Sequence, residues 1–382
     1  MHTLAARYRR RIARRPKTVV VQPDGFCNLD CSYCYLPERD RRTPMPVAVA
    51  EAVACSAAEL AAASPEPIEI VWHAGEPLAV GRRRFTELLA PFEPLRKAGL
   101  VQHSMQTNAV LITPAWCDFL TEYGFRVGVS IDGPAALNRQ RVDWAGRPAF
   151  DRIMKGIGRL RECGVRFSVI AVVSTESVGD PEGLLDFMAG LGCHSVGLNM
   201  EETEGVNTDR AVPTVEQACE FWRRTIAWSR RHPEPAVREV DRLGSYLRAV
   251  RADGPSAWDG LLIDPIPTVS SAGDVVLLSP ELAGISDPAY EDFRAGNVLE
   301  SSIGSMLERG HELRYVREFL TGLDECEATC EYFGFCRGAQ AGNRYFENGR
   351  LDTTETNYCR VSKQALVTAL SDTVREEQAA CP

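Results

Sequence analysis

The sequence predicts an α/β fold, in which a partial (β/α)6 barrel of the TIM type precedes a smaller C-terminal α+β domain. Apolar strand patterns alternate six times with helical patterns over the first 235 residues. The strand patterns are nearly continuous apolar runs, as expected when both faces of a parallel sheet are buried. Right-handed crossovers between such strands curl the sheet toward a barrel. A chain of 382 residues leaves room for a second, smaller domain.

Each strand–helix unit is an apolar run followed by a helical pattern. The expected strands cover residues 18–24, 68–72, 101–106, 126–132, 166–174 and 194–200. The helical patterns begin near Pro46, Arg82, Pro114, Ala149, Pro181 and Val215. A charged helical stretch to residue 253 then leads to a short strand at 274–278. We therefore place a basic arm at 1–17, the barrel at 18–235, a helical bridge at 236–268 and the second domain at 269–382.

Composition and charge exclude several classes of function. The net charge of −9 gives no reason to expect nucleic acid as a partner. No run approaches the ~18 apolar residues of a membrane span, and the N-terminus lacks the apolar core of a secretory signal. We therefore expect a cytoplasmic protein without a membrane partner. The basic run at 7–17 is expected to be a solvated, mobile arm, with contact to an acidic partner as the alternative.

The thirteen cysteines are gathered in clusters, which favours metal ligation in a reducing compartment over disulfide bonds. Cys27, Cys31 and Cys34 follow the first strand at Cys-x3-Cys-x2-Cys spacing. Three thiolates without a fourth partner nearby indicate an iron–sulfur cluster with one open iron, and a zinc knuckle or three unrelated thiols is the alternative. Five further cysteines are expected to be core thiols: Cys55, Cys117, Cys163, Cys193 and Cys219.

Polar residues follow the other expected strands at the point where each strand ends. They are found at 75–77, 106–108, 130–134, 174 and 201–207. Because the carboxyl ends of parallel strands meet at one face of a barrel, we expect these residues to converge with the cysteines. That face is where β/α barrels place their active sites.

The cysteine spacing, with the aromatic Tyr33 directly before the third cysteine, resembles the radical S-adenosylmethionine (SAM) superfamily. In that family the open iron of a 4Fe–4S cluster chelates SAM and cleaves it to a 5′-deoxyadenosyl radical. The resemblance therefore implies SAM and a three-cysteine cluster as cofactors. It also implies an external electron donor of the flavodoxin or ferredoxin type.

The resemblance further implies which residues contact SAM. Gly75, Glu76 and Pro77 resemble the segment that binds the SAM ammonium group, and Arg141 is expected to face the SAM carboxylate. The remaining polar contacts to the cofactor are expected from Asn108, Ser130, Asp132 and Ser174.

A second cysteine cluster lies in the C-terminal part of the chain. Its members are Cys326, Cys330, Cys336 and Cys359. Four thiolates fit a closed 4Fe–4S cluster or a structural zinc site equally well by spacing alone. The segment resembles the SPASM/twitch-like extension of peptide-modifying radical SAM enzymes, which implies iron. Full SPASM domains hold two clusters, but here residues 270–280 contain no cysteine and Gln340 stands where a further one is often found, so we expect one auxiliary cluster.

Several segments are similar to the maturases of glycine-rich-repeat peptides, which belong with the three-residue cyclophane synthases. They are residues 72–78, 106–108, 127–134, 201–207, 279–282, 296–298, 345–349 and 354–356. The similarity implies a ribosomally synthesised precursor peptide as substrate. It also implies a C–C crosslink from the β-carbon of one residue to an aromatic ring two positions away. The auxiliary cluster would accept the electron that the ring adduct loses.

Glu201, Glu202 and Glu204 are our candidates for the acceptor of the proton that the ring adduct loses, with loop carboxylates that serve only as caps as the alternative. Two other readings of the whole chain remain. One is a different peptide modification on the same scaffold, such as sulfatase-maturase-like oxidation of Cys or Ser, thioether formation or epimerisation. The other is an iron–sulfur or zinc sensor without SAM chemistry.

Overall fold

The structure is a computed structural model that describes residues 4–62 and 66–380. Six parallel strands form the centre of a single sheet: β1 (Thr18–Val21), β2 (Ile68–Trp72), β3 (Val101–Thr107), β4 (Arg126–Ser130), β5 (Phe167–Val173) and β6 (Ser195–Met200). The strand order is β10-β9-β8-β1-β2-β3-β4-β5-β6-β7. The predicted α/β fold with a mostly parallel sheet is confirmed.

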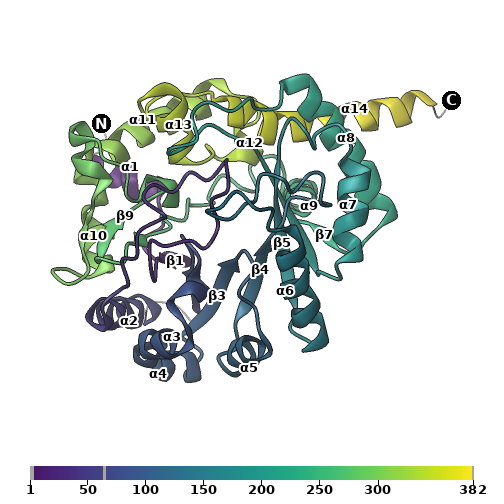
Figure 1. Ribbon diagram of the computed structural model, residues 1–382. Helices are drawn as coiled ribbons and strands as arrows, with labels where there is room; N and C mark the ends of the chain where they lie inside the picture. Colours follow the sequence, from purple (N-terminus) through teal and green to yellow (C-terminus); the bar gives the residue numbers. More distant parts are fainter. Residues whose placement is uncertain (1–3, 63–65, 381–382) are drawn as a thin grey trace.

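Helices cover the outer face of this curved sheet (Figure 1). They are α2 (Val47–Ala61), α3 (Arg82–Leu89), α4 (Glu93–Lys97), α5 (Pro114–Glu122), α6 (Phe150–Glu162), α7 (Pro181–Gly190), α8 (Val215–Arg231) and α9 (Arg238–Asp253). Polar residues fix several of their starts. Thr113 and Asp180 cap α5 and α7, and Thr214 forms a capping box with Gln217 at α8.

The C-terminal part is joined to the barrel through the sheet. β8 (Thr268–Val269) pairs in parallel with β1, and β9 (Asp274–Val276) and β10 (Gly296–Asn297) follow in antiparallel fashion. On the other side, β7 (Ala236–Val237) pairs with β6. The boundary that the sequence predicts between residues 268 and 269 therefore falls inside a strand that is hydrogen-bonded to the barrel.

The remaining elements form a layer over one end of the sheet (Figure 1). They are α10 (Ile303–Arg309), α11 (Arg314–Thr329), α12 (Phe333–Cys336), α13 (Ala341–Asn348), the π-helical turn η6 (Cys359–Gln364) and α14 (Ala365–Ala380). The indole N–H of Trp222 in α8 donates to the Val361 carbonyl at 2.8 Å, which ties this layer to the barrel. No helix in the described ranges is both long and apolar enough to cross a membrane.

The basic N-terminal segment is helical rather than a solvated arm in its described part. It forms α1 (Leu4–Arg11), and Tyr8 on this helix is buried. Arg7 and Arg11 form ion pairs with Asp324, and Arg11 also pairs with Glu327. The expectation of a mobile arm is wrong for these residues, because their acidic partner is α11 of the same chain.

Candidate active site

The loop between β1 and α2 carries the first three cysteines and is folded back on itself. Asp24 is buried, and its carboxylate accepts from the backbone N–H groups of Phe26 at 3.1 Å and Thr43 at 2.6 Å. The Cys27 N–H donates to the Arg39 carbonyl at 2.8 Å. These contacts hold both ends of the loop together above the sheet, under the C-terminal layer (Figure 1).

The three thiols of this loop lie close enough to affect one another's ionisation. Burial raises the pKa of Cys31 to about 11 and also raises the pKa values of Cys27 and Cys34. The Cys27 thiol accepts from the Leu29 N–H at 3.4 Å and from the Asn108 amide at 3.8 Å. A buried thiolate needs a cationic partner. This three-sulfur donor set therefore fits a 4Fe–4S cluster with one iron left open.

The Gly75–Pro77 turn joins the end of β2 to the cysteine loop. A side chain on Gly75, whose φ is +57°, would place its Cβ 2.4 Å from the Phe26 carbonyl oxygen, so this close approach requires glycine. Glu76 is 1% exposed and accepts from the Leu78 N–H, the Thr107 hydroxyl and the Asn108 N–H. Both carboxylate oxygens are thus already engaged. In this structure Glu76 fastens the ends of β2 and β3 to each other.

Asp132 and Arg141 form a buried, bidentate ion pair. The guanidinium donates to the carboxylate at 2.8 and 3.0 Å, and the Tyr33 hydroxyl donates to it at 2.6 Å. The Arg141 guanidinium also lies 5.4 Å from the centre of the Tyr33 ring. Since Tyr33 lies between two of the cysteines in sequence, this group of three connects β4 to the cysteine loop. The positive charge of Arg141 is largely matched by Asp132.

The other predicted polar contacts also lie at this end of the strands. Asn108 donates to the Asn28 side chain at 2.8 Å as well as to Cys27. Ser130 accepts from the Gln106 amide at 2.8 Å. Ser174 is 9% exposed, and its hydroxyl accepts from the Glu176 N–H at 3.2 Å. The structure therefore gathers these residues at one end of the strands, and Asn108 reaches a cysteine directly.

The three glutamates after β6 lie in different surroundings. Glu201 is 2% exposed and forms an ion pair with Arg210. Glu202 accepts a hydrogen bond from Asn343 of α13. Burial raises the pKa values of Glu202 and Glu204 well above the usual range, with neighbouring carboxylates, Glu281 among them, acting in the same direction. Glu202 and Glu204 thus have raised pKa values, and Glu201 has a cationic partner.

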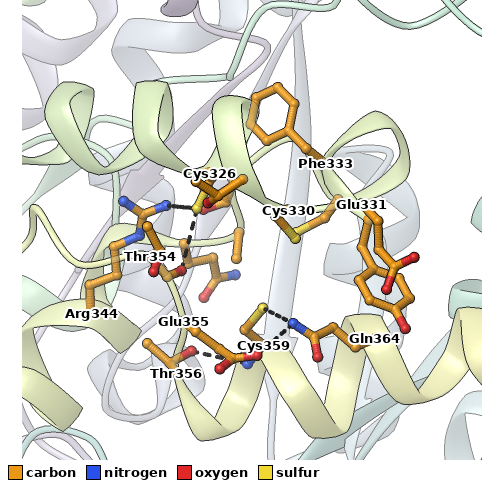
Figure 2. A pocket seen from close by; sticks show the side chains of 16 residues that line it. Cys326, Cys330, Glu331, Phe333, Arg344, Thr354, Glu355, Thr356, Cys359 and Gln364 are labelled. Carbon is orange, nitrogen blue, oxygen red and sulfur yellow. Dashed lines mark hydrogen bonds between the residues drawn. The ribbon is translucent and has the colours of Figure 1, made fainter.

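The second cysteine cluster surrounds one cavity of about 490 Å³ in the C-terminal layer (Figure 2). Its four cysteines come from the end of α11, from α12 and from η6: Cys326, Cys330, Cys336 and Cys359. A single ion needs far less room, since a water molecule occupies only ~30 Å³ of liquid. The cavity and its donors therefore fit a 4Fe–4S cluster.

Two N–H donors approach these sulfurs from opposite sides of the cavity (Figure 2). The Arg344 guanidinium donates to the Cys326 thiol at 3.4 Å, and the Gln364 amide donates to the Cys359 thiol at 3.7 Å. A hydrogen bond from Cys359 also holds the pKa of Cys336 below its usual range. The thiolate is the form that binds iron, and a lowered pKa favours it.

Four side chains at these sites were not identified from the sequence. They are Arg210, Glu281, Arg344 and Tyr33, the last as the hydrogen-bond donor to Asp132. Tyr33 was noted only as an aromatic residue beside a cysteine. Arg344 and Glu281 lie far from their partners in sequence, so no local spacing indicates them. The five described cysteines outside both sites lie in or beside α2, α5, α6, α8 and β6, and no disulfide joins any of the twelve cysteines in the described ranges. Cys117 and Cys193 are buried as expected, but the expectation of a core thiol is wrong for Cys55 and Cys163, which are exposed.

The sequence profile of the Radical SAM superfamily matches residues 21–188. An uncharacterised protein of Synechocystis sp. is 33% identical over 374 residues, covering 94% of this chain and 92% of the relative. A serine-type anaerobic sulfatase-maturating enzyme of Bacteroides thetaiotaomicron is 30% identical over 188 residues, covering 48% of this chain. The match spans only 45% of that enzyme.

Two solved structures share the fold over most of the chain. One is native anSMEcpe with bound AdoMet and Cp18Cys peptide, with a TM-score of 0.70, 18% identity, and coverage of 95% of this chain and 99% of that one. The other is Streptococcus suis SuiB bound to precursor peptide SuiA, with a TM-score of 0.66, 17% identity, and coverage of 91% and 76%. At these identities the likeness concerns the fold alone.

Proposed function

Because the chain belongs to the radical SAM superfamily, we propose that it modifies a ribosomally synthesised precursor peptide. The modification would be a three-residue cyclophane, a C–C bond between an aromatic ring and the β-carbon of a residue two positions away. A peptide substrate is supported by the peptide ligands of two proteins that share its fold, SuiB and anSMEcpe. We place the protein in the cytoplasm, since its described cysteines are free thiols.

The observation that carries the proposal is one four-cysteine cavity, in addition to the three-cysteine loop, among the residues that the structure describes. The described cysteines outside these two sites are dispersed over the outer helices and the start of β6. One auxiliary cluster matches the resemblance to cyclophane synthases better than the two-cluster pattern of sulfatase maturases. Oxidation of a Cys or Ser side chain therefore stands as the second candidate.

The chain's own residues would hold the proposed cofactors as follows. Cys27, Cys31 and Cys34 would bind the cluster that supplies the 5′-deoxyadenosyl radical from SAM, and the second site would supply an electron acceptor. The turn at Gly75–Pro77 keeps the cysteine loop against β2 and β3. The remaining SAM contacts would come from Asn108, Ser130, Asp132, Arg141 and Ser174, all of which lie at the same end of the barrel.

Among the three glutamates, Glu202 and Glu204 suit the role of proton acceptor best. A carboxylate with a raised pKa is a stronger base, and both side chains are only partly exposed. Glu201 is held by Arg210 and would position the loop instead. Electrons would come from a flavodoxin- or ferredoxin-like donor, as the superfamily's chemistry requires.

The test is a reaction of the anaerobically reconstituted protein with SAM, dithionite and a short peptide with aromatic-x-x motifs, to be sought in the reading frames beside its gene. Loss of two hydrogens, located by fragmentation between an aromatic residue and the residue two positions away, is the expected result. Loss of two hydrogens from one Cys or Ser would favour the maturase reading. An unchanged mass with deoxyadenosine released would point to epimerisation, and no deoxyadenosine at all would favour the sensor.

The metal content provides a second check. We expect about eight irons per chain for two 4Fe–4S clusters, falling to about four in the Cys27→Ala/Cys31→Ala/Cys34→Ala variant. Bound zinc with about four irons in the unaltered protein would make the second site structural and would remove the proposed electron acceptor.

A further inference from the structure

Arg344 is a buried cation that forms no ion pair with a carboxylate in the part of the chain that the structure describes. It is 2% exposed and lies on α13 with its guanidinium 5.0 Å from the centre of the Phe319 ring. Its other partners are the carbonyls of Leu351 and Gly338, at 3.3 and 3.0 Å, and the Cys326 thiol. Carbonyl oxygens satisfy its N–H groups but do not neutralise its charge. A buried charge of this kind requires an anionic partner.

The fold reserves the space that this guanidinium occupies. Gly322 lies inside α11 and is buried, and a Cβ there would lie 2.0 Å from Arg344 Nη1 and 2.6 Å from the Thr353 carbonyl oxygen. Glycine in a helix interior lowers stability relative to alanine. The glycine at this position therefore serves to admit the arginine rather than to stabilise the helix.

A neighbouring arginine, Arg337, lacks this arrangement. Arg337 directly follows Cys336 and is also buried, at 8% exposed. Its guanidinium, however, is ion-paired with Asp259 at 3.3 Å and lies over the Phe333 ring. Of the two arginines, only Arg344 donates to a sulfur of the cavity (Figure 2).

We propose that Arg344 is the counter-ion of the auxiliary cluster and raises its reduction potential, so that the cluster is an acceptor rather than a donor of electrons. The inference rests on the proposed function, because that function places a four-thiolate cluster in this cavity. Four thiolates give the oxidised cluster a net negative charge, and reduction adds one electron. A fixed cation beside a ligand sulfur stabilises the more negative, reduced state. In turnover that electron would come from the aryl radical adduct, which loses one electron and one proton as its ring regains aromaticity.

The experiment uses the full chain carrying Cys27→Ala, Cys31→Ala and Cys34→Ala, so that the auxiliary cluster is the only one present. Its midpoint potential is measured by a redox titration that is monitored by electron paramagnetic resonance. The iron content is determined on the same samples. Arg344→Met should lower the equilibrium constant for reduction at least tenfold, which is about 59 mV for a one-electron couple. Arg337→Met is the matched control, and its potential should stay at the parent value.

A second pair of variants separates charge from folding. Arg344→Gln and Arg344→Lys both shorten the side chain and keep an N–H donor, but only lysine keeps the charge. If Arg344→Met holds less iron than the parent, the comparison of Arg344→Lys with Arg344→Gln becomes the test of the charge effect. A potential for Arg344→Lys above that of Arg344→Gln supports the inference. Equal potentials for the two, or an Arg344→Met protein with full iron and an unshifted potential, would overturn it. A parent protein without four irons would instead disprove the proposed auxiliary cluster itself.

Discussion

In the loop after β1, three thiols lie near cations that already have carboxylate partners, whereas in the C-terminal layer four thiols surround a cavity beside an arginine that has none in the described part of the chain. Arg39 and Arg141 near the first site are paired with Asp30 and Asp132. Arg344 at the second site donates to a sulfur directly. The comparison teaches that the same ligand atom has different charged neighbours at the two sites, and we expect this difference to separate the reduction potentials of the two proposed clusters.

Removing a thiol from the first site should have the largest effect. Cys27→Ala leaves two thiols on the loop, too few to hold the cluster that cleaves SAM, so deoxyadenosine release under dithionite should fall to background. Cys55→Ala, an exposed cysteine on α2, is the control and should retain release. Substantial deoxyadenosine release from Cys27→Ala would contradict the assignment of the SAM-cleaving cluster to the first cysteine site.

Removing a thiol from the second site should separate the two functions. Cys336→Ala should halve the iron content and lower crosslinked product by about 100-fold, while deoxyadenosine release persists within about tenfold of the unaltered protein. The measurement is product mass and deoxyadenosine from the same reaction. Parallel loss of both would mean that the second site supports the first rather than acting as an acceptor.

Part of the sensitivity to acid should come from the barrel, where burial lowers the pKa values of His73 and His103 to about 4. His103 on β3 is fully buried against Trp72, and burial lowers its pKa to about 4. The folded state then binds fewer protons than the unfolded state, whose histidine has a pKa near 6.5, so stability is lost as pH falls through this window. The loss should reach about 3 kcal/mol by pH 4.

Urea unfolding between pH 7 and 4 tests this expectation. His103→Gln should lose about half of the pH dependence that the buried histidines cause, because burial lowers the pKa of His73 to about 4 as well, whereas substitution of the partly exposed His311 should leave it in place. An equally steep pH dependence in His103→Gln would assign the acid sensitivity to other groups, the cysteine sites included.

The smallest effect should come from filling the space beside Arg344. Gly322→Ala should lower the free energy of unfolding by about 1–3 kcal/mol, because its Cβ overlaps the guanidinium and a carbonyl. Gly158→Ala in α6, where nothing lies within 4 Å of the added Cβ, should instead raise it by about 0.5–1 kcal/mol. An unchanged free energy of unfolding in Gly322→Ala would mean that Arg344 moves easily and is not a fixed counter-ion.

The barrel was predictable because its signal is local. Each central strand is an apolar run, and the six observed strands begin within one residue of the predicted starts. The two groups of cysteines could also be identified from their spacing in the sequence. The pairing of Asp132 with Arg141 and Tyr33, and the approach of Arg344 to Cys326, depend on contacts between separate elements. No periodicity within one segment encodes them. The docking of α1 on α11 was missed for the same reason. The sequence of a basic segment is the same whether the segment is solvated or packs against a helix that is distant in the sequence.

The shared sheet has a consequence for how the C-terminal layer can be separated from the barrel. β8 joins that layer to β1, and Trp222 of α8 is hydrogen-bonded to it as well. The layer and the barrel should therefore unfold as one cooperative unit. A cut at the expected boundary between residues 268 and 269 would expose unpaired strand edges on both fragments instead of releasing two independent domains.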